Sequence, residues 1–123
     1  MWMRFKVGDV SVEAQMNKSK TARFLWDRLP ITGEAELFGG EVYLYLAACT
    51  GLEEPFAAEA VEVGTVAYWP QGPCLCLFLG PTPASRDAEI RPASTVTVVG
   101  KIIGDATRLS SVKAGDKIEV TRA

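Results

Sequence analysis

Apolar and polar residues alternate along most of this chain, and glycine and proline interrupt the alternation at short intervals. A period of two residues is typical of β-strands that bury one face. The strand-like segments, in chain order, are residues 3–7, 10–14, 31–38, 42–46, 61–63, 66–69, 74–79, 95–103 and 117–121. Gly8–Asp9 and Gly39–Gly40 each lie between two such segments and predict tight hairpin turns.

One segment has helical spacing instead. Residues 22–29 place apolar side chains on one face, Ser19 or Thr21 can cap the first turn, and Pro30 ends the segment. A shorter helical turn is expected at 109–112. Short strands with glycine and proline at their joints, plus one or two short helices, predict a mainly β barrel or sandwich. The helices would cover its open ends.

The composition fits a single domain spanning residues 1–123. Apolar residues make up 48% of the chain and charged residues 23%, as in an ordinary soluble globular protein. The net charge is −2 and lysine and arginine form no run, so we expect no nucleic-acid partner. No apolar stretch approaches the ~20 residues that span a bilayer, and the N-terminus lacks the apolar segment of a signal peptide. We therefore expect a cytoplasmic location and no membrane partner.

The sequence contains no histidine. This absence excludes Ser-His-Asp and Cys-His catalysis, zinc sites with histidine ligands, and an imidazole acting as general base near neutral pH. Catalysis in this chain would have to depend on carboxylates, lysine, tyrosine, cysteine or hydrogen bonding.

The segments GTVAYWPQGPCLCLFLGPTPAS and EIRPASTVTVVGKI give the chain a family resemblance, and GGEVYLYL (39–46) and AGDKIEV (114–120) fit it as well. The chain resembles small prokaryotic proteins of unknown function that share a cyclophilin-like β-barrel fold. The resemblance implies a closed eight-stranded antiparallel barrel capped by one or two short helices. This agrees with the strand pattern found independently.

Cyclophilin activity does not follow from the resemblance. The strand TVTVVGKI resembles the cyclophilin strand that the catalytic histidine precedes, and Val96 occupies the aligned position of that histidine. The segment EVYLYL carries no basic residue where a cyclophilin supplies its arginine. Phe78 alone lies near the position of the phenylalanine that cyclophilins present to proline. Prolyl isomerase activity is therefore the alternative hypothesis, and fold similarity cannot supply the missing groups.

The three cysteines point to packing. On a strand, Cys74 and Cys76 would share one face at a separation of ~6.5–7 Å, which is too far for a disulfide. With Cys49 as the remaining thiol and no histidine, the ligands of a soft-metal site are incomplete. We expect no metal and no cofactor.

Aromatic residues and the long loop at 80–94 offer a candidate binding surface. Tyr68, Trp69 and Phe78 would either close one end of the barrel or form a shallow apolar site. In the loop, Arg91 precedes a proline that restricts its backbone, so its guanidinium could bind a carboxylate or phosphate. The alternative is a surface ion pair with Glu89 or Asp87.

These observations favour a binding domain without catalytic activity, whose ligand is a small anionic molecule or an extended peptide. The predicted contact residues are Tyr43, Tyr68, Trp69, Phe78, Thr82, Ser85 and Arg91. Self-association into a homo-oligomer is a third hypothesis, which an exposed apolar strand edge would support.

Overall fold

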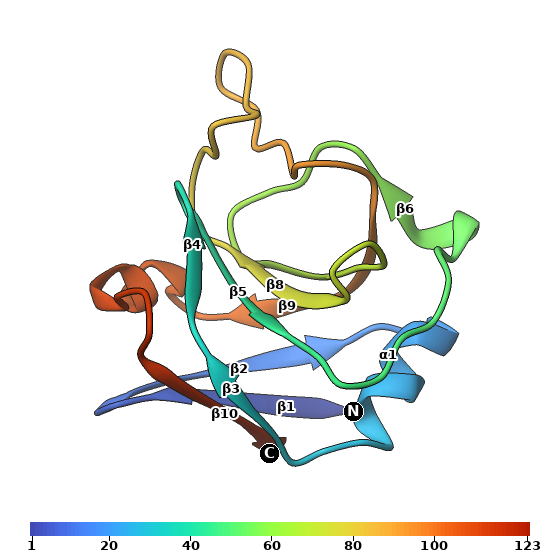
Figure 1. Ribbon diagram of the computed structural model, residues 1–123, viewed down its shortest axis with the longest axis vertical. Helices are drawn as coiled ribbons and strands as arrows, with labels where there is room; N and C mark the ends of the chain where they lie inside the picture. Colours follow the sequence, from blue (N-terminus) through green and yellow to red (C-terminus); the bar gives the residue numbers. More distant parts are fainter.

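Ten antiparallel strands and three short helical segments make up the structure, a computed structural model that describes residues 1–123 (Figure 1). The strands are β1 (Trp2–Val7), β2 (Val10–Met16), β3 (Ile31–Glu34), β4 (Glu36–Phe38), β5 (Glu41–Tyr45), β6 (Ala57–Ala58), β7 (Thr65–Trp69), β8 (Cys74–Phe78), β9 (Val96–Ile103) and β10 (Lys117–Arg122). The helix α1 is Lys20–Trp26, and the two 3₁₀ segments are η1 (Glu54–Phe56) and η2 (Ala106–Ser111). The prediction of a mainly β fold with a few short helices is confirmed.

The strands form one sheet in the order β3-β10-β1-β2-β9-β7-β8-β5-β4, and β6 pairs with β9 outside this path. The hydrogen-bonded path does not close, because its two edges are β3 and β4. The buried residue Ala35 connects β3 to β4 along the chain. Its N–H donates to the carbonyl of Asp116 and its carbonyl accepts from the N–H of Gly115, so Ala35 does not continue a strand ladder. The prediction of a closed, eight-stranded barrel is therefore wrong in these two details.

The main core lies on the concave side of this sheet and contains 22 buried residues. Period-two alternation directs one face of each strand into it, which is the arrangement that the sequence predicted. Helix α1 and the η2 segment lie on opposite sides of the molecule in Figure 1. Both contribute to this core: Ala22 and Leu25 from α1, and Ala106 and Leu109 from η2.

Helix α1 begins as predicted and ends early. The Ser19 hydroxyl oxygen accepts a hydrogen bond from the N–H of Ala22 at 3.0 Å, which satisfies one free donor of the first turn. The helix ends at Trp26, and a turn carries the chain from there to Pro30. None of the helices has the length and apolar character that crossing a membrane requires.

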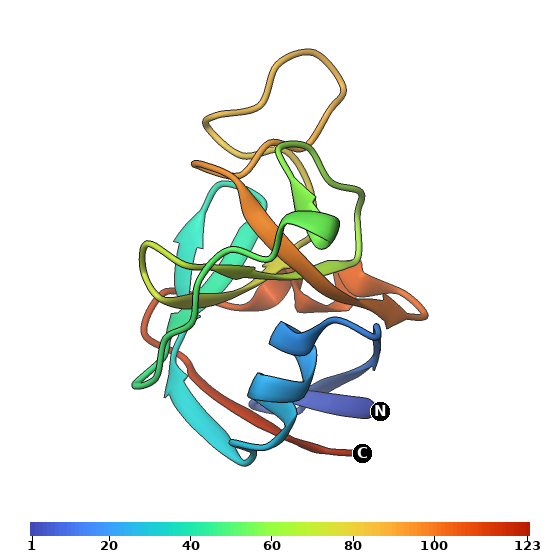
Figure 2. The same cartoon turned by 90° about the vertical axis from the view of Figure 1, so that its right-hand side faces the viewer.

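The β4–β5 hairpin is fixed to the long loop at 80–94, which extends beyond the sheet (Figure 2). The Gly40 N–H donates to the carbonyl of Pro81 at 2.7 Å, and the Leu79 N–H donates to the carbonyl of Gly40 at 2.7 Å. A Cβ atom on Gly40 would lie 2.5 Å from the Gly80 backbone, so this approach requires glycine. The hairpin and the start of the loop therefore hold one fixed relative position.

Residues 61–63, predicted as a strand, form a single bridge between Val61 and Ile90. Gly64 follows with a φ of +92°, which turns the chain before a longer ladder can form. The bridge nevertheless holds the far end of the 80–94 loop against the outer face of the sheet.

Candidate functional site

The outer face of β8 and its neighbouring strands carries a second apolar cluster, separate from the main core. Alternation along β8 directs its two leucines inward and Cys74, Cys76 and Phe78 outward. All five residues of β8 are buried, because Ile90 and its neighbours in the cluster cover the outward side chains. A strand buried on both faces makes this part of the sheet a rigid support.

The ladder between β5 and β8 fixes a row of side chains along this outer face. Glu41 lies opposite Phe78, Tyr43 opposite Cys76, and Tyr45 opposite Cys74. Because alternate residues share a face, Glu41, Tyr43 and Tyr45 follow one another along β5. The two tyrosine rings pack edge to face, with centroids 5.8 Å apart and an interplanar angle of 74°.

A cavity of about 200 Å³ opens beside this row. Its lining comes from the hairpin, the three strands β5, β7 and β9, and the end of the loop: Phe38, Glu41, Tyr43, Tyr45, Trp69, Pro92, Ala93 and Val96. One of these residues, Val96, is the residue that the sequence resemblance places at the position of the cyclophilin histidine. The lining contains one charged residue, Glu41, and no basic residue.

Glu41 is the chemically distinctive residue of the cavity. It is 6% exposed, yet no N–H or O–H group donates to its carboxyl and no lysine or arginine forms an ion pair with it. Every fully buried side-chain oxygen in the protein has a hydrogen-bond partner. Because the Glu41 oxygens accept from no N–H or O–H group, they must be accessible at the cavity surface. Desolvation raises the pKa of Glu41, although the nearby Cys76 thiol opposes part of this increase.

The Trp69 ring is held in place by hydrogen bonds at its polar edge. Its indole N–H donates to the Ser94 hydroxyl oxygen at 2.6 Å, and the Ser94 hydroxyl donates to the side-chain oxygen of Gln71 at 3.0 Å. The indole therefore has a fixed orientation beside the cavity. An aromatic wall, a buried carboxyl and the absence of a countercharge form a site of negative potential.

The predicted contact residues divide into two groups. Tyr43 and Trp69 line the cavity, whereas Tyr68 and Phe78 are fully buried. Tyr68 follows the opposite face of β7 from Trp69 and packs in the main core. Its hydroxyl donates to the Thr50 carbonyl at 3.1 Å and accepts from the Thr50 N–H at 2.8 Å. Neither buried ring presents a free surface to a ligand in this structure.

The predicted loop residues bond to the loop itself. The Thr82 hydroxyl donates to the Arg91 carbonyl, and the Ser85 hydroxyl oxygen accepts from the N–H groups of Thr82 and Arg91 at 2.9 and 3.0 Å. The Arg91 guanidinium pairs with Glu89 at 2.8 Å, as in the ion-pair alternative. Together these bonds shape the loop and place Pro92 beside the cavity.

Several residues that line the cavity were not predicted from the sequence. Glu41 was missed because a charged residue directly after a Gly-Gly turn is usually solvent-exposed. Strand alternation would have predicted its position, since Glu41 and Tyr45 share a face of β5 with Tyr43. Pro92 and Ala93 had no comparable signal, because their position depends on how the loop folds back.

The thiols of β8 are not nucleophiles. Burial raises the pKa of Cys74 to about 11 and raises the pKa of Cys76 well above its ordinary value, so both thiols remain protonated near neutral pH. All three cysteines are free, and Cys49 is the exposed one. This agrees with the packing role predicted for Cys74 and Cys76.

Comparisons with known proteins place the fold in a family. The model of the family described as "Cyclophilin-like" matches residues 1–121. A hypothetical protein from Archaeoglobus fulgidus, solved in solution, is 34% identical and superposes with a TM-score of 0.82 over 100% of this chain and 95% of that one. No curated protein matches the chain. The chain belongs to the cyclophilin-like family.

Proposed function

We propose that this cyclophilin-like protein is a binding domain whose outer-face cavity takes a small organic cation. The cation would be a free amine or quaternary ammonium compound, or the basic side chain of an extended peptide. The observation that carries the proposal is Glu41, a buried carboxyl without a cationic partner in an aromatic cavity.

Charge and geometry support a cationic ligand. Leaving a buried carboxylate unpaired is unfavourable, and a bound cation would supply the missing charge. The faces of Tyr43, Tyr45 and Trp69 offer the negative potential that organic cations prefer. Glu36 lies opposite Tyr43 in the β4–β5 ladder and adds a second negative charge nearby.

The volume limits the size of the ligand. Cavities that hold drug-sized molecules measure ~300–1,000 Å³. A cavity of about 200 Å³ fits a smaller ligand or one side chain. This is the reason for proposing a compact ammonium group instead of a large cofactor.

An anionic ligand, the hypothesis from sequence, has less support at this site. It depended on Arg91, whose guanidinium is engaged by Glu89, and the cavity itself carries a negative group. Any anion placed here would meet Glu41 without a compensating cation.

Prolyl isomerisation also has less support. A cyclophilin-type site needs a basic group beside the prolyl peptide bond, and the lining of this cavity contains none. An isomerase assay on a proline-containing tetrapeptide should give no rate above background. A rate that Trp69→Leu abolishes would favour the isomerase hypothesis instead.

Self-association stays a prediction. The exposed large apolar residues belong to different strands and loops: Met1, Trp2, Leu37, Tyr45, Leu52, Val63 and Ile103. Leu37 lies on the edge strand β4 and is 43% exposed. Sedimentation of the wild type and Leu37→Lys tests whether this edge pairs with another copy.

Binding of choline tests the proposed function directly. Chemical shifts of the backbone amides are followed during titration with choline and with dimethylbutanol, the neutral analogue in which carbon replaces the nitrogen. We expect choline to shift amides of β5, β7 and residues 92–96, and dimethylbutanol to bind at least tenfold more weakly. Glu41→Gln should weaken choline binding similarly, and Glu119→Gln, an exposed acid on β10, should not. Equal binding of the two compounds, or no binding of either, would refute the proposal.

A further inference from the structure

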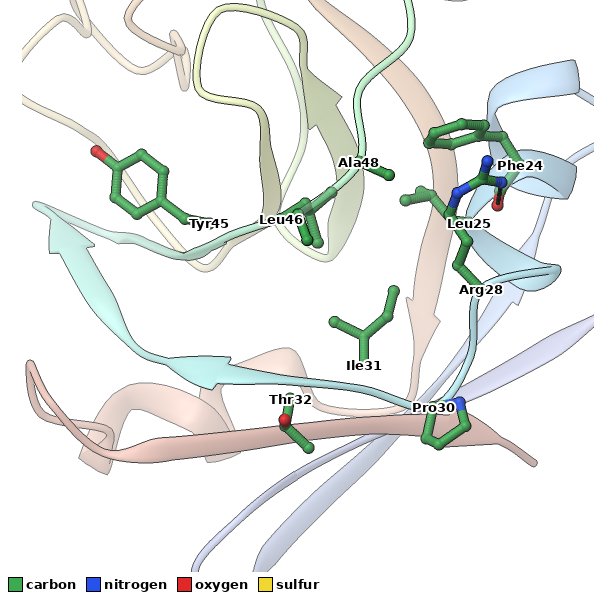
Figure 3. A pocket seen from close by; sticks show the side chains of 10 residues that line it. Phe24, Leu25, Arg28, Pro30, Ile31, Thr32, Tyr45, Leu46 and Ala48 are labelled. Carbon is green, nitrogen blue, oxygen red and sulfur yellow. Dashed lines mark hydrogen bonds between the residues drawn. The ribbon is translucent and has the colours of Figure 1, made fainter.

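A second and larger cavity lies where α1 passes the end of β5 (Figure 3). Its volume is about 330 Å³, and its lining is mostly apolar. The residues are Phe24, Leu25, Arg28, Pro30, Ile31, Thr32, Tyr45, Leu46, Ala47 and Ala48. Tyr45 lies between the two cavities and lines both.

The charge of this second cavity is opposite to that of the first. Arg28 is its one charged residue, and no aspartate or glutamate lines it. Three arginines, Arg4, Arg23 and Arg91, form ion pairs. Arg28 belongs to the group without a carboxylate within salt-bridge distance, and it is the one member of that group that lines this cavity. Its positive charge is therefore available to a ligand.

The Arg28 guanidinium is held in place without being saturated. Its central carbon lies 3.6 Å from the centroid of the Phe24 ring, and one N–H donates to the Phe24 carbonyl at 2.9 Å. A guanidinium has five N–H donors, so most of them remain free for a ligand. Stacking on the Phe24 ring fixes the plane of the guanidinium and lowers the entropy that the guanidinium loses when it binds a planar anion.

We propose that this cavity binds a monocarboxylate with an apolar tail. The tail would lie among Leu25, Ile31 and Leu46, whose side chains face the same space as Phe24 (Figure 3). The carboxylate would accept two parallel hydrogen bonds from Arg28, the arrangement that gives guanidinium–carboxylate pairs their strength. In this proposal the basic partner of an anionic ligand is Arg28, in the turn after α1, and not Arg91 in the 80–94 loop.

The tail-binding part of the cavity is independent of the proposed cation site. The Tyr45 ring points away from Phe24 and Arg28 (Figure 3), so a ligand bound here need not displace one beside Glu41. Choline binding is expected to persist when this second cavity is filled, and the two proposals can fail separately.

Octanoate is the probe, compared with octylamine, which has the same tail and the opposite charge. Amide chemical shifts and the melting temperature are measured during titration of the full chain. Octanoate should bind saturably, shift amides of residues 24–32 and 45–48, and raise the melting temperature. Octylamine should shift the amides of residues 24–32 at least tenfold more weakly, because its ammonium group would meet Arg28 there. As a free amine it could bind beside Glu41 instead, and that binding would shift amides of β7 and residues 92–96.

Single substitutions distinguish octanoate binding in this cavity from nonspecific electrostatic attraction to the protein surface. Arg28→Gln should weaken octanoate binding about tenfold, the loss expected for one charge-assisted pair. Arg23→Gln removes an equal charge from the neighbouring helix α1, outside the cavity, and should leave binding unchanged. Ala48→Phe should fill the cavity and abolish binding while Arg28 stays intact. No saturable octanoate binding, equal octylamine binding as read from the amides of residues 24–32, or equal effects of the two arginine variants would overturn the proposal.

Discussion

Glu41 and Phe78 lie directly opposite each other in the antiparallel ladder between β5 and β8, so a buried carboxyl and a buried phenyl ring occupy neighbouring positions on one face. The phenyl ring helps to exclude water from one side of the carboxyl, and the cavity provides its opening. This pairing is the reason for expecting that protonation of Glu41 affects stability and, in the proposed function, ligand binding.

The first prediction concerns the pH dependence of stability. Burial raises the pKa of Glu41 in the folded protein above its ordinary value. Between the unfolded and folded pKa values, the folded state holds more protons than the unfolded state, so the free energy of unfolding falls as pH rises. At pH values below both pKa values, burying Glu41 costs no stability from ionisation, because the carboxyl is protonated in both states. At pH values above both, the carboxyl is ionised in both states and the full cost of burying its charge applies.

Glu41→Gln removes this penalty, so its stability relative to the wild type should increase as pH rises through the window. Each unit of pKa difference corresponds to about 1.4 kcal/mol. Urea unfolding at a series of pH values, without organic cations, measures the effect, and Glu119→Gln serves as control. A stability difference that stays constant with pH would contradict the prediction.

The second prediction concerns the aromatic wall. Trp69→Leu should weaken choline binding by about 1–2 kcal/mol, or roughly five- to thirtyfold, because an apolar side chain lacks the negative face of the indole. Trp69→Phe should lose less choline affinity, because phenylalanine keeps an aromatic face. Isothermal titration measures both affinities, and an equal loss in the two variants would assign Trp69 a purely space-filling role.

The third prediction concerns the loop that borders the cavity. Thr82→Val removes the hydroxyl that donates to the Arg91 carbonyl and accepts from the Ala84 N–H at 3.2 Å. The unpaired backbone groups should lower the free energy of unfolding by about 1–3 kcal/mol. Amide exchange should become faster between residues 82 and 94.

Thr82→Ser retains the hydroxyl and should keep most of the stability. If Thr82→Val and Thr82→Ser behave alike in urea unfolding and amide exchange, the hydroxyl does not hold the loop.

The fourth prediction concerns thiol reactivity. In the native protein only Cys49 should react quickly with an aromatic disulfide reagent at neutral pH, because it is exposed. Cys74 and Cys76 are buried, with pKa values that leave little thiolate. Cys49→Ser should therefore show no fast reaction until the protein unfolds, and rapid labelling of two thiols in the native state would show that β8 is accessible.

Local patterns in the sequence predicted most of the fold. The Gly39–Gly40 turn, the Ser19 cap and the alternating strands are features of neighbouring residues, and each is present in the structure. Sheet closure was predicted wrongly because it depends on Ala35, whose backbone bonds to a turn 80 residues later in the chain. No local pattern reports such a contact.

The candidate site was predicted less completely than the fold. Placing Tyr68 and Trp69 in one site conflicted with strand alternation, which sends adjacent residues to opposite faces. The hydroxyls and guanidinium of the 80–94 loop suggested ligand contacts, but in the structure they satisfy the loop's own backbone and charges. Glu41 acquires its significance from burial, and burial arises from the tertiary packing of β4, β8 and the loop.

The most direct measurement is the affinity for choline as a function of pH, from below the ordinary pKa of glutamate to above neutrality. If an ionised Glu41 holds the cation, the affinity of the wild type should rise with pH and level off once the carboxyl is fully ionised, whereas that of Glu41→Gln should be weak and flat. A wild-type affinity that does not change with pH, or a variant with the same pH profile, would contradict the role of Glu41.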